Sequence, residues 1–520
     1  MTEHEELLLN QDEYEEEGDD LSRVRTHDTL LIDEPSLERS VGLLYLLTLT
    51  CGVGGLQVIW SVILSNGSPF LVSLGLSKSL TALVWVAAPL SGVVVQPLVG
   101  TWSDRIVSRL GRRRPFIIGG AIGVVLSMLA LAWIEDLTYG FTKPSNYQQS
   151  PTQTWAGLRT LIVENCPTHQ QNQASAWAGA MTGVGNTLGY LSGFTVLPEL
   201  FRSKHLTQFQ CLCMIASVSL TITVTISCSI LEPDSPPERV DRAGFLAVLS
   251  DLLYTYRSMP LKVRKVCHIQ FFAWMGWFPF LFYSTTYVGE FYAARVKARD
   301  LAPGSIQTMN RVALIPRTSS GTADPKDGDG LCEDAIRFGT FASFLFAIVA
   351  FLANILLPFV LPALNQVSSS TTPSKKFHIS QLWFWGHTFF ALAMFATFFI
   401  RSQLGATLLV ACIGLSWALT LWAPFAIIGN ELSARQSLRD CITDISGEEP
   451  PPASRDVQAG AIMGLHNVAI SSPQIIAALA CSGIFGLAKM LGSQTGTGWV
   501  LRAGGSAALG AAYLTSRFDR

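Results

Sequence analysis

The stretch Trp85–Ile117, WVAAPLSGVVVQPLVGTWSDRIVSRLGRRRPFI, decides the fold. It consists of an uncharged apolar run, a group of charged residues and the start of a second apolar run. The charged group includes Asp104, Arg105, Arg109 and the arginines at 112–114. We interpret the stretch as two membrane spans joined by a short basic loop. Since basic loops stay on the cytoplasmic side of a membrane, this loop sets the orientation of the whole chain.

The composition excludes a soluble multidomain protein. About half of the 520 residues are hydrophobic (49%), only 14% are charged, and the mean hydropathy is +0.35, which together indicate a membrane protein with many spans. Residues 1–40 contain an acidic run, and we expect them to form a disordered cytoplasmic tail. They lack the features of a signal peptide, so we expect the first apolar span to direct insertion. The ten cysteines lie mostly in apolar segments and predict neither a disulfide framework nor a metal site.

Apolar runs of about 20 residues, the length that crosses about 30 Å of hydrocarbon, mark the predicted spans. They lie at 41–64, 80–101, 115–134, 174–197, 209–231, 267–288, 339–362, 382–401, 405–428, 460–488 and 499–516. Between these spans we expect a long polar loop at 289–337, and a polar and basic stretch at 232–266 falls near the middle of the chain. We therefore predict two helical bundles, at 41–231 and 267–516, joined by this cytoplasmic linker, with a cytoplasmic tail at 517–520.

The orientation and the number of spans disagree by one crossing. With the basic loop near 103–114 inside, eleven spans would place the basic linker outside. The gap falls at 135–173, where only a short apolar run is present. If this segment crosses as a poorly formed fourth span, the basic residues of the short loops fall mostly on the cytoplasmic side.

Several sequence blocks resemble one family. These are GLQVIWSVI at 55–63, VQPLVGTWSDR at 95–105, RLGRRRPFI at 109–117, NTLGYLSG at 186–193, FFAWMGWFPFLFYSTTYVGE at 271–290 and LWAPFAIIGNEL at 421–432. The chain resembles the sucrose transporter branch of the major facilitator superfamily. The resemblance implies an all-α integral membrane protein of two six-helix bundles, and proton-coupled symport of sucrose, maltose and related α-glucosides. Ser284 and Thr286 stand where plant-type members carry aspartates, which indicates the fungal type.

The resemblance also implies a proton-coupling pair in the fourth span. In LRTLIVEN, Arg159 and Glu164 match an arginine and an acid that handle substrate and proton in the family, with glutamate in place of aspartate. A charge in a membrane costs about 2.5 to 3.5 kcal/mol unless it is paired or lines a wet cavity. The alternative is a surface loop whose charges are solvated. The polar segment 142–155 just before this pair departs from the family, and a mis-joined exon is one hypothesis for it.

We predict that polar and aromatic side chains inside the spans contact the sugar: Gln57, Arg159, Asn186, Trp277 and Asn354. Trp60, Trp274, His387, Trp417, His466 and Asn467 are weaker candidates, since most residues of these types in a span serve packing. The glycines at 183, 185, 189 and 193 share one helical face and predict a close helix contact. The superfamily resemblance implies that Asp104, Arg105, Arg112 and Arg113 form salt bridges at a cytoplasmic gate, although the cluster could be only an orientation signal.

The predicted function is import of an α-glucoside disaccharide with protons by alternating access, without a cofactor or metal. The partners are then the sugar, protons and the lipid bilayer, and not nucleic acid; we expect a monomer in the plasma membrane rather than the vacuolar membrane, with both termini cytoplasmic. A sugar sensor that binds without transport is the alternative. A membrane enzyme is less favoured, because no paired carboxylates, metal cluster or nucleophile motif stands at a suitable place.

Overall fold

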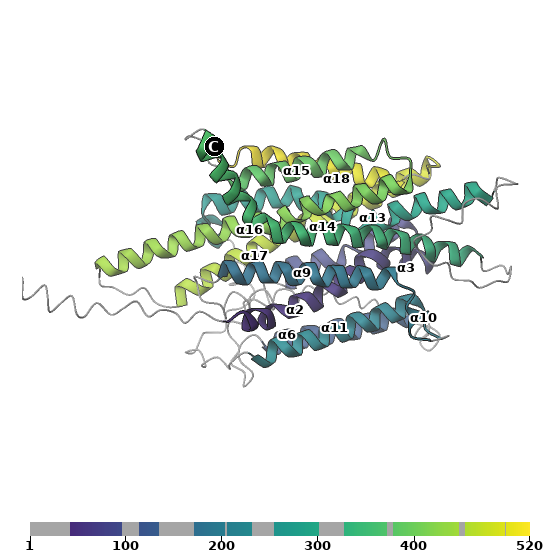
Figure 1. Ribbon diagram of the computed structural model, residues 1–520, viewed down its shortest axis with the longest axis horizontal. Helices are drawn as coiled ribbons and strands as arrows, with labels where there is room; N and C mark the ends of the chain where they lie inside the picture. Colours follow the sequence, from purple (N-terminus) through teal and green to yellow (C-terminus); the bar gives the residue numbers. More distant parts are fainter. Residues whose placement is uncertain are drawn as a thin grey trace, which may run out of the picture. The chain divides into compact units, whose positions relative to one another are not determined.

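The computed structural model describes most of the hydrophobic part of the chain (Figure 1). The described residues are 42–95, 114–134, 171–202, 205–230, 254–300, 327–371, 378–446, 453–493 and 496–519. Leu43–Arg520 forms one compact unit. The described residues are helical apart from short turns and contain no strand.

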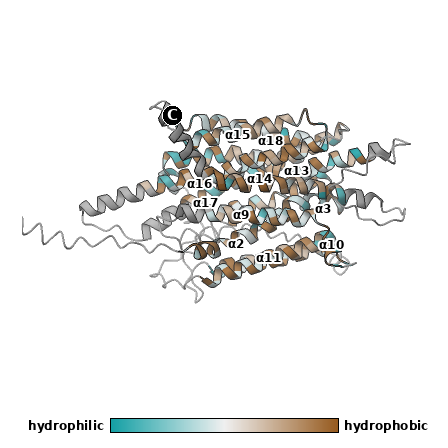
Figure 2. Ribbon diagram, in the orientation of Figure 1, coloured by the Kyte–Doolittle hydropathy of each residue, from teal (hydrophilic) through white to brown (hydrophobic). Residues whose placement is uncertain are grey.

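Each of the predicted span ranges contains a helix. The helices are α2 (Leu43–Val62), η1 (Ile63–Gly67), α3 (Ser68–Ser73), α4 (Lys78–Val84), a helix at 87–95, α6 (Arg114–Ala132), α9 (Gln171–Phe194), α10 (Leu197–Leu200), α11 (Gln208–Ile230), α13 (Leu261–Asp300), α14 (Asp327–Thr371), α15 (Ile379–Ala396), α16 (Gln403–Ser446), α17 (Ala453–Met490) and α18 (Gly496–Ser516). By length and composition alone, 7 helical segments of the described residues could cross a membrane. Figure 2 shows the predominance of hydrophobic residues along helices such as α11.

Four helices are longer than the spans predicted for them. α13, α14, α16 and α17 have 40, 45, 44 and 38 residues. At 1.5 Å per residue each is about 57 to 68 Å long, roughly twice the thickness of the hydrocarbon core. The prediction of a polar loop over 289–337 is therefore wrong at both ends, because α13 continues to Asp300 and α14 begins at Asp327. An apolar run marks only the part of a helix that lies in hydrocarbon.

The first span changes its helical type near its end. α2 passes into the π-helical turn η1 and then into α3, which has a proline in its first turn. Pro69 has no backbone N–H to donate to the preceding turn, and a wider turn accommodates this break without ending the helix.

α9 packs closely against α2, and α11 packs on the other side of α2. A β-carbon added at Gly189 would lie only 2.6 Å from Cβ of Ser61 on α2, so this contact requires glycine. The close approach predicted from the glycine series is confirmed. α9 also packs against α14, and α4 against α17, so helices on the two sides of the predicted linker are in direct contact.

Candidate functional site

A buried polar network joins α2 to α9. Nε2 of Gln57 donates to Oδ1 of Asn186 at 2.8 Å, and the hydroxyl of Ser61 donates to the same oxygen at 2.9 Å. The three side chains are almost fully buried. Thus the structure brings together Gln57 and Asn186, two residues that the sequence predicts as sugar contacts.

These bonds leave hydrogen-bonding capacity in the network. They use Oδ1 of Asn186 and Nε2 of Gln57, so the amide nitrogen of Asn186 and Oε1 of Gln57 remain as a donor and an acceptor. A sugar hydroxyl can both donate and accept a hydrogen bond, and it therefore matches such a pair. The same network also holds α2 and α9 together, since buried amides need partners.

Trp277 lies in an aromatic cluster at the centre of α13. Its ring centroid is 4.2 Å from Phe390 and 4.9 Å from Trp417, and its Nε1 donates to the hydroxyl of Thr420 at 3.2 Å. The side chain is buried. In this conformation the polar atom of Trp277 is therefore used inside the protein, and the predicted sugar contact stays a prediction.

Two neighbouring tryptophans offer unused donors. Trp274 and Trp417 pack edge to face at 5.7 Å, and Nε1 of each is buried without a hydrogen bond. A buried indole N–H without a partner is unfavourable, and a sugar hydroxyl could satisfy it. The sequence marked both residues as weaker candidates because a tryptophan in a span is usually a packing residue; the missing hydrogen bonds are visible only in the structure.

The remaining predicted residues give less information about the site. Asn354 is half-buried on α14, and its Nδ2 donates to the carbonyl of Ala350 in its own helix at 3.0 Å. The predicted coupling residues Arg159 and Glu164 lie outside the described residues, as do the predicted gate residues Asp104, Arg105, Arg112 and Arg113. Within the part of the chain that the structure describes, no group of three or more His, Cys, Asp or Glu residues could hold a metal ion.

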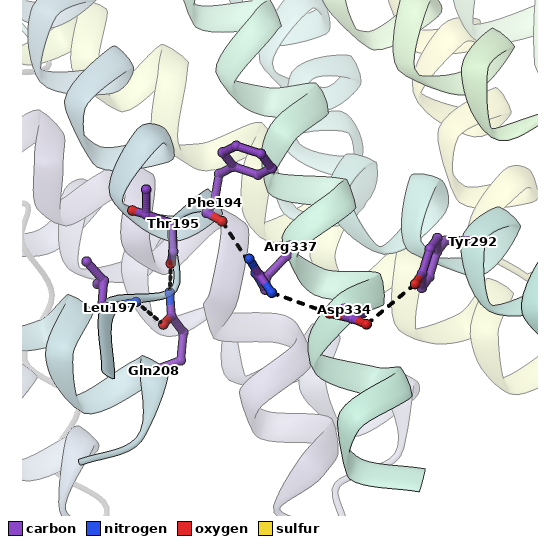
Figure 3. Close-up of polar contacts among 7 residues, drawn as sticks. All are labelled: Phe194, Thr195, Leu197, Gln208, Tyr292, Asp334 and Arg337. Atoms are coloured by element: carbon purple, nitrogen blue, oxygen red, sulfur yellow. Dashed lines mark hydrogen bonds and ion pairs between the residues drawn. The ribbon is translucent and has the colours of Figure 1, made fainter. Parts of the chain in front are cut away.

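A buried arginine connects α14 to the end of α9 (Figure 3). Nε of Arg337 donates to the carbonyl oxygen of Phe194 at 3.4 Å, and Nη1 lies 3.4 Å from Oδ1 of Asp334. Tyr292 on α13 donates its hydroxyl to Oδ2 of Asp334 at 3.5 Å. Arg337 is only 5% exposed, so its charge depends on these partners. The last carbonyls of a helix have no partner within it, and a cation is favourable there.

Gln208, the first residue of α11, binds the backbone just beyond α9. Its Nε2 donates to the carbonyl of Thr195 at 2.7 Å, and its Oε1 accepts from the backbone N–H of Leu197 at 3.0 Å (Figure 3). The end of α9 is therefore held in place from α11 as well as from α14.

A second ionic contact lies at the same end of the helices. Nζ of Lys78 on α4 is 2.6 Å from Oε1 of Glu290 on α13, and the hydroxyl of Thr497 on α18 donates to the same oxygen at 2.6 Å. A β-carbon on Gly289 would lie 2.8 Å from the carbonyl oxygen of Ala335, so this part of α13 adjoins the start of α14. We call the contacts of Arg337 and Lys78 together the latch.

The latch joins the predicted N-terminal bundle to the predicted C-terminal bundle. Ser79 and Ser482, whose hydroxyls are 2.9 Å apart, connect α4 to α17 near the same end. At the opposite end, the ion pair of Lys262 and Glu431 at 3.2 Å joins two helices of the C-terminal bundle. The sequence does not predict the latch, because Glu290, Asp334 and Arg337 fall within 289–337, the stretch expected to be a loop.

Comparison with known proteins agrees with this architecture. Residues 50–185 match the family described as MFS/sugar transport protein. The general alpha-glucoside permease of Schizosaccharomyces pombe is 31% identical over 90% of this chain and 92% of that protein. Sucrose transport protein SUT1 of Oryza sativa subsp. japonica is 28% identical, but the match covers 48% of this chain and only 53% of that protein.

Solved structures of major facilitator transporters share the fold. A bacterial homologue of the human lysosomal transporter Spinster, in an inward-facing and occupied conformation, has a TM-score of 0.53 at 13% identity, covering 91% of this chain and 96% of that chain. The xylose transporter XylE from E. coli has a TM-score of 0.51 at 14% identity, covering 92% of this chain and 98% of that chain. Because the 31% identity to the permease extends over 90% of the chain, the chain belongs to the major facilitator family of sugar transport proteins, which are all-helical membrane transporters and not enzymes.

Proposed function

We propose that this chain imports α-glucosides such as sucrose and maltose together with protons, by alternating access. The observation that carries the proposal is the similarity over 90% of the chain to a protein named as a general alpha-glucoside permease. We propose the division into bundles at 41–231 and 267–516 as the two parts that move relative to one another.

The proposed sugar site lies between the bundles. Gln57 and Asn186 would bind sugar hydroxyls from one side, and the cluster around Trp277 would provide an aromatic surface from the other. Arg159 and Asn354 are proposed to complete the site. A disaccharide presents many hydroxyls and an apolar C–H face, so a few fixed amides beside an aromatic surface are the groups that would select it.

The latch supports alternating access, because it closes one end of the contact between the bundles. We propose that this end faces outward and that Asp104, Arg105, Arg112 and Arg113 form the gate at the cytoplasmic end. Breaking the latch while the inner gate forms would expose the site to the outside. In this orientation both termini are cytoplasmic, and we propose that the protein acts as a monomer in the plasma membrane.

We propose Glu164 as the group that carries the coupling proton, with Arg159 as its partner. Glu290, Asp334 and Glu431 lie just outside the predicted apolar spans 267–288, 339–362 and 405–428, and none of the acidic residues of the described helices stands inside a predicted span. A coupling acid must be reachable from both sides in turn and must exchange its proton. Glu164, which falls within the proposed fourth span, meets the first requirement by its position in the sequence.

Uptake of radiolabelled sucrose and maltose into transport-deficient yeast tests the function. We expect accumulation of at least one sugar, and we expect a protonophore to abolish that accumulation. Uptake that is insensitive to the protonophore would refute symport. Binding of sugar without any uptake would instead favour a sensor.

The Glu164→Gln variant tests the coupling role. It should lose accumulation but keep exchange of labelled for unlabelled sugar, because only the proton step is removed. The matched control is Glu199→Gln, since Glu199 is an exposed acid on α10. Accumulation by Glu164→Gln at the level of the control would contradict the assignment.

A further inference from the structure

An apolar groove runs between α6 and α11, which pack side by side (Figure 1). Its volume is about 430 Å³, and its lining includes Arg114, Ile118, Ile122, Val125, Val224 and Cys228. Both helices are long and apolar enough to cross a membrane. The groove is separate from the proposed sugar site and from the latch.

The groove opens on a face that belongs in lipid. Ile122 and Leu126 on α6 are 55% and 62% exposed, and Ile222 on α11 is 54% exposed. Aliphatic side chains exposed on a span contact lipid chains rather than water. The groove therefore suits a lipid chain better than a polar solute.

One end of the groove carries a positive charge. Arg114 is the first residue of α6 and lines the groove, and its Nη2 atom is buried without a hydrogen bond. A buried guanidinium nitrogen without a partner is unfavourable, and the amino end of α6 adds further positive potential. Both features favour an anion at this place. In the sequence Arg112 and Arg113 directly precede it.

The length of the groove matches one leaflet of a bilayer. From Arg114 to Leu126 the helix rises about 18 Å, and half of the hydrocarbon core is about 15 Å. A phosphate at Arg114 would therefore place an acyl chain of the same lipid along Ile118, Ile122 and Val125. We propose that this groove binds one anionic phospholipid, with its phosphate on Arg114 and one acyl chain between α6 and α11.

Native mass spectrometry of the purified full-length protein tests the proposal. The protein is titrated with phosphatidylglycerol and with phosphatidylcholine of the same acyl chains. We expect the wild type to retain phosphatidylglycerol preferentially. Arg114→Gln should weaken phosphatidylglycerol binding about tenfold or more and phosphatidylcholine binding less, because the choline of phosphatidylcholine already balances the charge of its phosphate.

Three further variants separate the charge from the groove. Arg114→Lys should keep the preference for the anionic lipid, and Ile122→Trp, which fills the groove, should weaken binding of both lipids. Arg401→Gln removes an exposed arginine elsewhere and should change neither. Equal retention of the two lipids by the wild type would overturn the proposal. So would an undiminished preference in Arg114→Gln, or undiminished binding in Ile122→Trp.

Discussion

Replacing Arg337 by glutamine should open the latched end of the protein. The pair of Arg337 and Asp334 lies within α14 and is present whether the end is open or closed. Of the contacts of Arg337, only the bond to the carbonyl of Phe194 on α9 crosses between the bundles, so it is the one through which Arg337 biases the equilibrium. A hydrogen bond from a charged donor is worth about 1.5 to 3 kcal/mol, and the 3.4 Å distance places this one at or below the lower limit.

A loss of about 1 to 1.4 kcal/mol corresponds to a five- to tenfold larger open population. Ser79, half-buried against Ser482 across the contact between the bundles, reports on this opening when changed to cysteine. A membrane-impermeant maleimide should label this cysteine five to ten times faster in the Arg337→Gln background. The labelling rate of the same protein with Ser79 unchanged is subtracted, because it reports the native cysteines alone.

Matched variants show whether the effect belongs to the latch. Arg401→Gln, which removes an exposed arginine, should leave the labelling rate unchanged. Asp334→Asn should have a smaller effect than Arg337→Gln, because the bond from Arg337 to Phe194 remains. An unchanged labelling rate in Arg337→Gln would show that Arg337 does not hold this end closed.

Three other changes have defined outcomes. Oxidation of the double variant Ser79→Cys, Ser482→Cys should lock the end closed and abolish sugar uptake, and reduction should restore it, because the two side chains already meet across the bundles. Asn186→Ala should lower the free energy of unfolding by about 1 to 3 kcal/mol and reduce uptake, because it leaves Gln57 without its partner. Gly189→Ala should lower the melting temperature, with a loss of about 1 to 3 kcal/mol, because its β-carbon would meet Ser61.

Each of these changes has a control and a contradicting result. Uptake by each single cysteine variant should be insensitive to oxidation. If the double variant takes up sugar equally well in its oxidised and reduced forms, the contact between positions 79 and 482 does not need to open during transport. Gln474→Ala removes an amide bonded only to its own helix and should cost less than Asn186→Ala. Gly119→Ala places a β-carbon in open space and should leave the melting temperature unchanged. Equal losses of stability in Asn186→Ala and Gln474→Ala, or in Gly189→Ala and Gly119→Ala, would contradict the packing of α9 against α2.

The sequence alone predicts the helices well because each span must contain a run of apolar residues. The same rule hides the ends of α13 and α14, since a helix that leaves the hydrocarbon no longer needs apolar side chains. For this reason Glu290 and Arg337 were assigned to a loop. Their contacts also join residues far apart in the chain, such as Arg337 and Phe194, and no local pattern reports such a pair.

Part of the candidate site follows from the sequence for a physical reason. An amide inside a span must find a hydrogen-bond partner, and for this reason the sequence points to Gln57 and Asn186, which the structure joins by a hydrogen bond. A tryptophan in a span is usually a packing residue, so the sequence does not reveal that the indole N–H groups of Trp274 and Trp417 lack a hydrogen bond. Only the folded structure shows which indoles are bonded and which are not.

Coupled transport of an α-glucoside and a proton can be measured directly with the purified protein in liposomes that hold a pH-sensitive dye and no other ion gradient. Addition of maltose or sucrose outside should acidify the interior, and the rate should follow that of labelled sugar entry. Sugar entry without any change of internal pH would show that this protein does not couple sugar to protons.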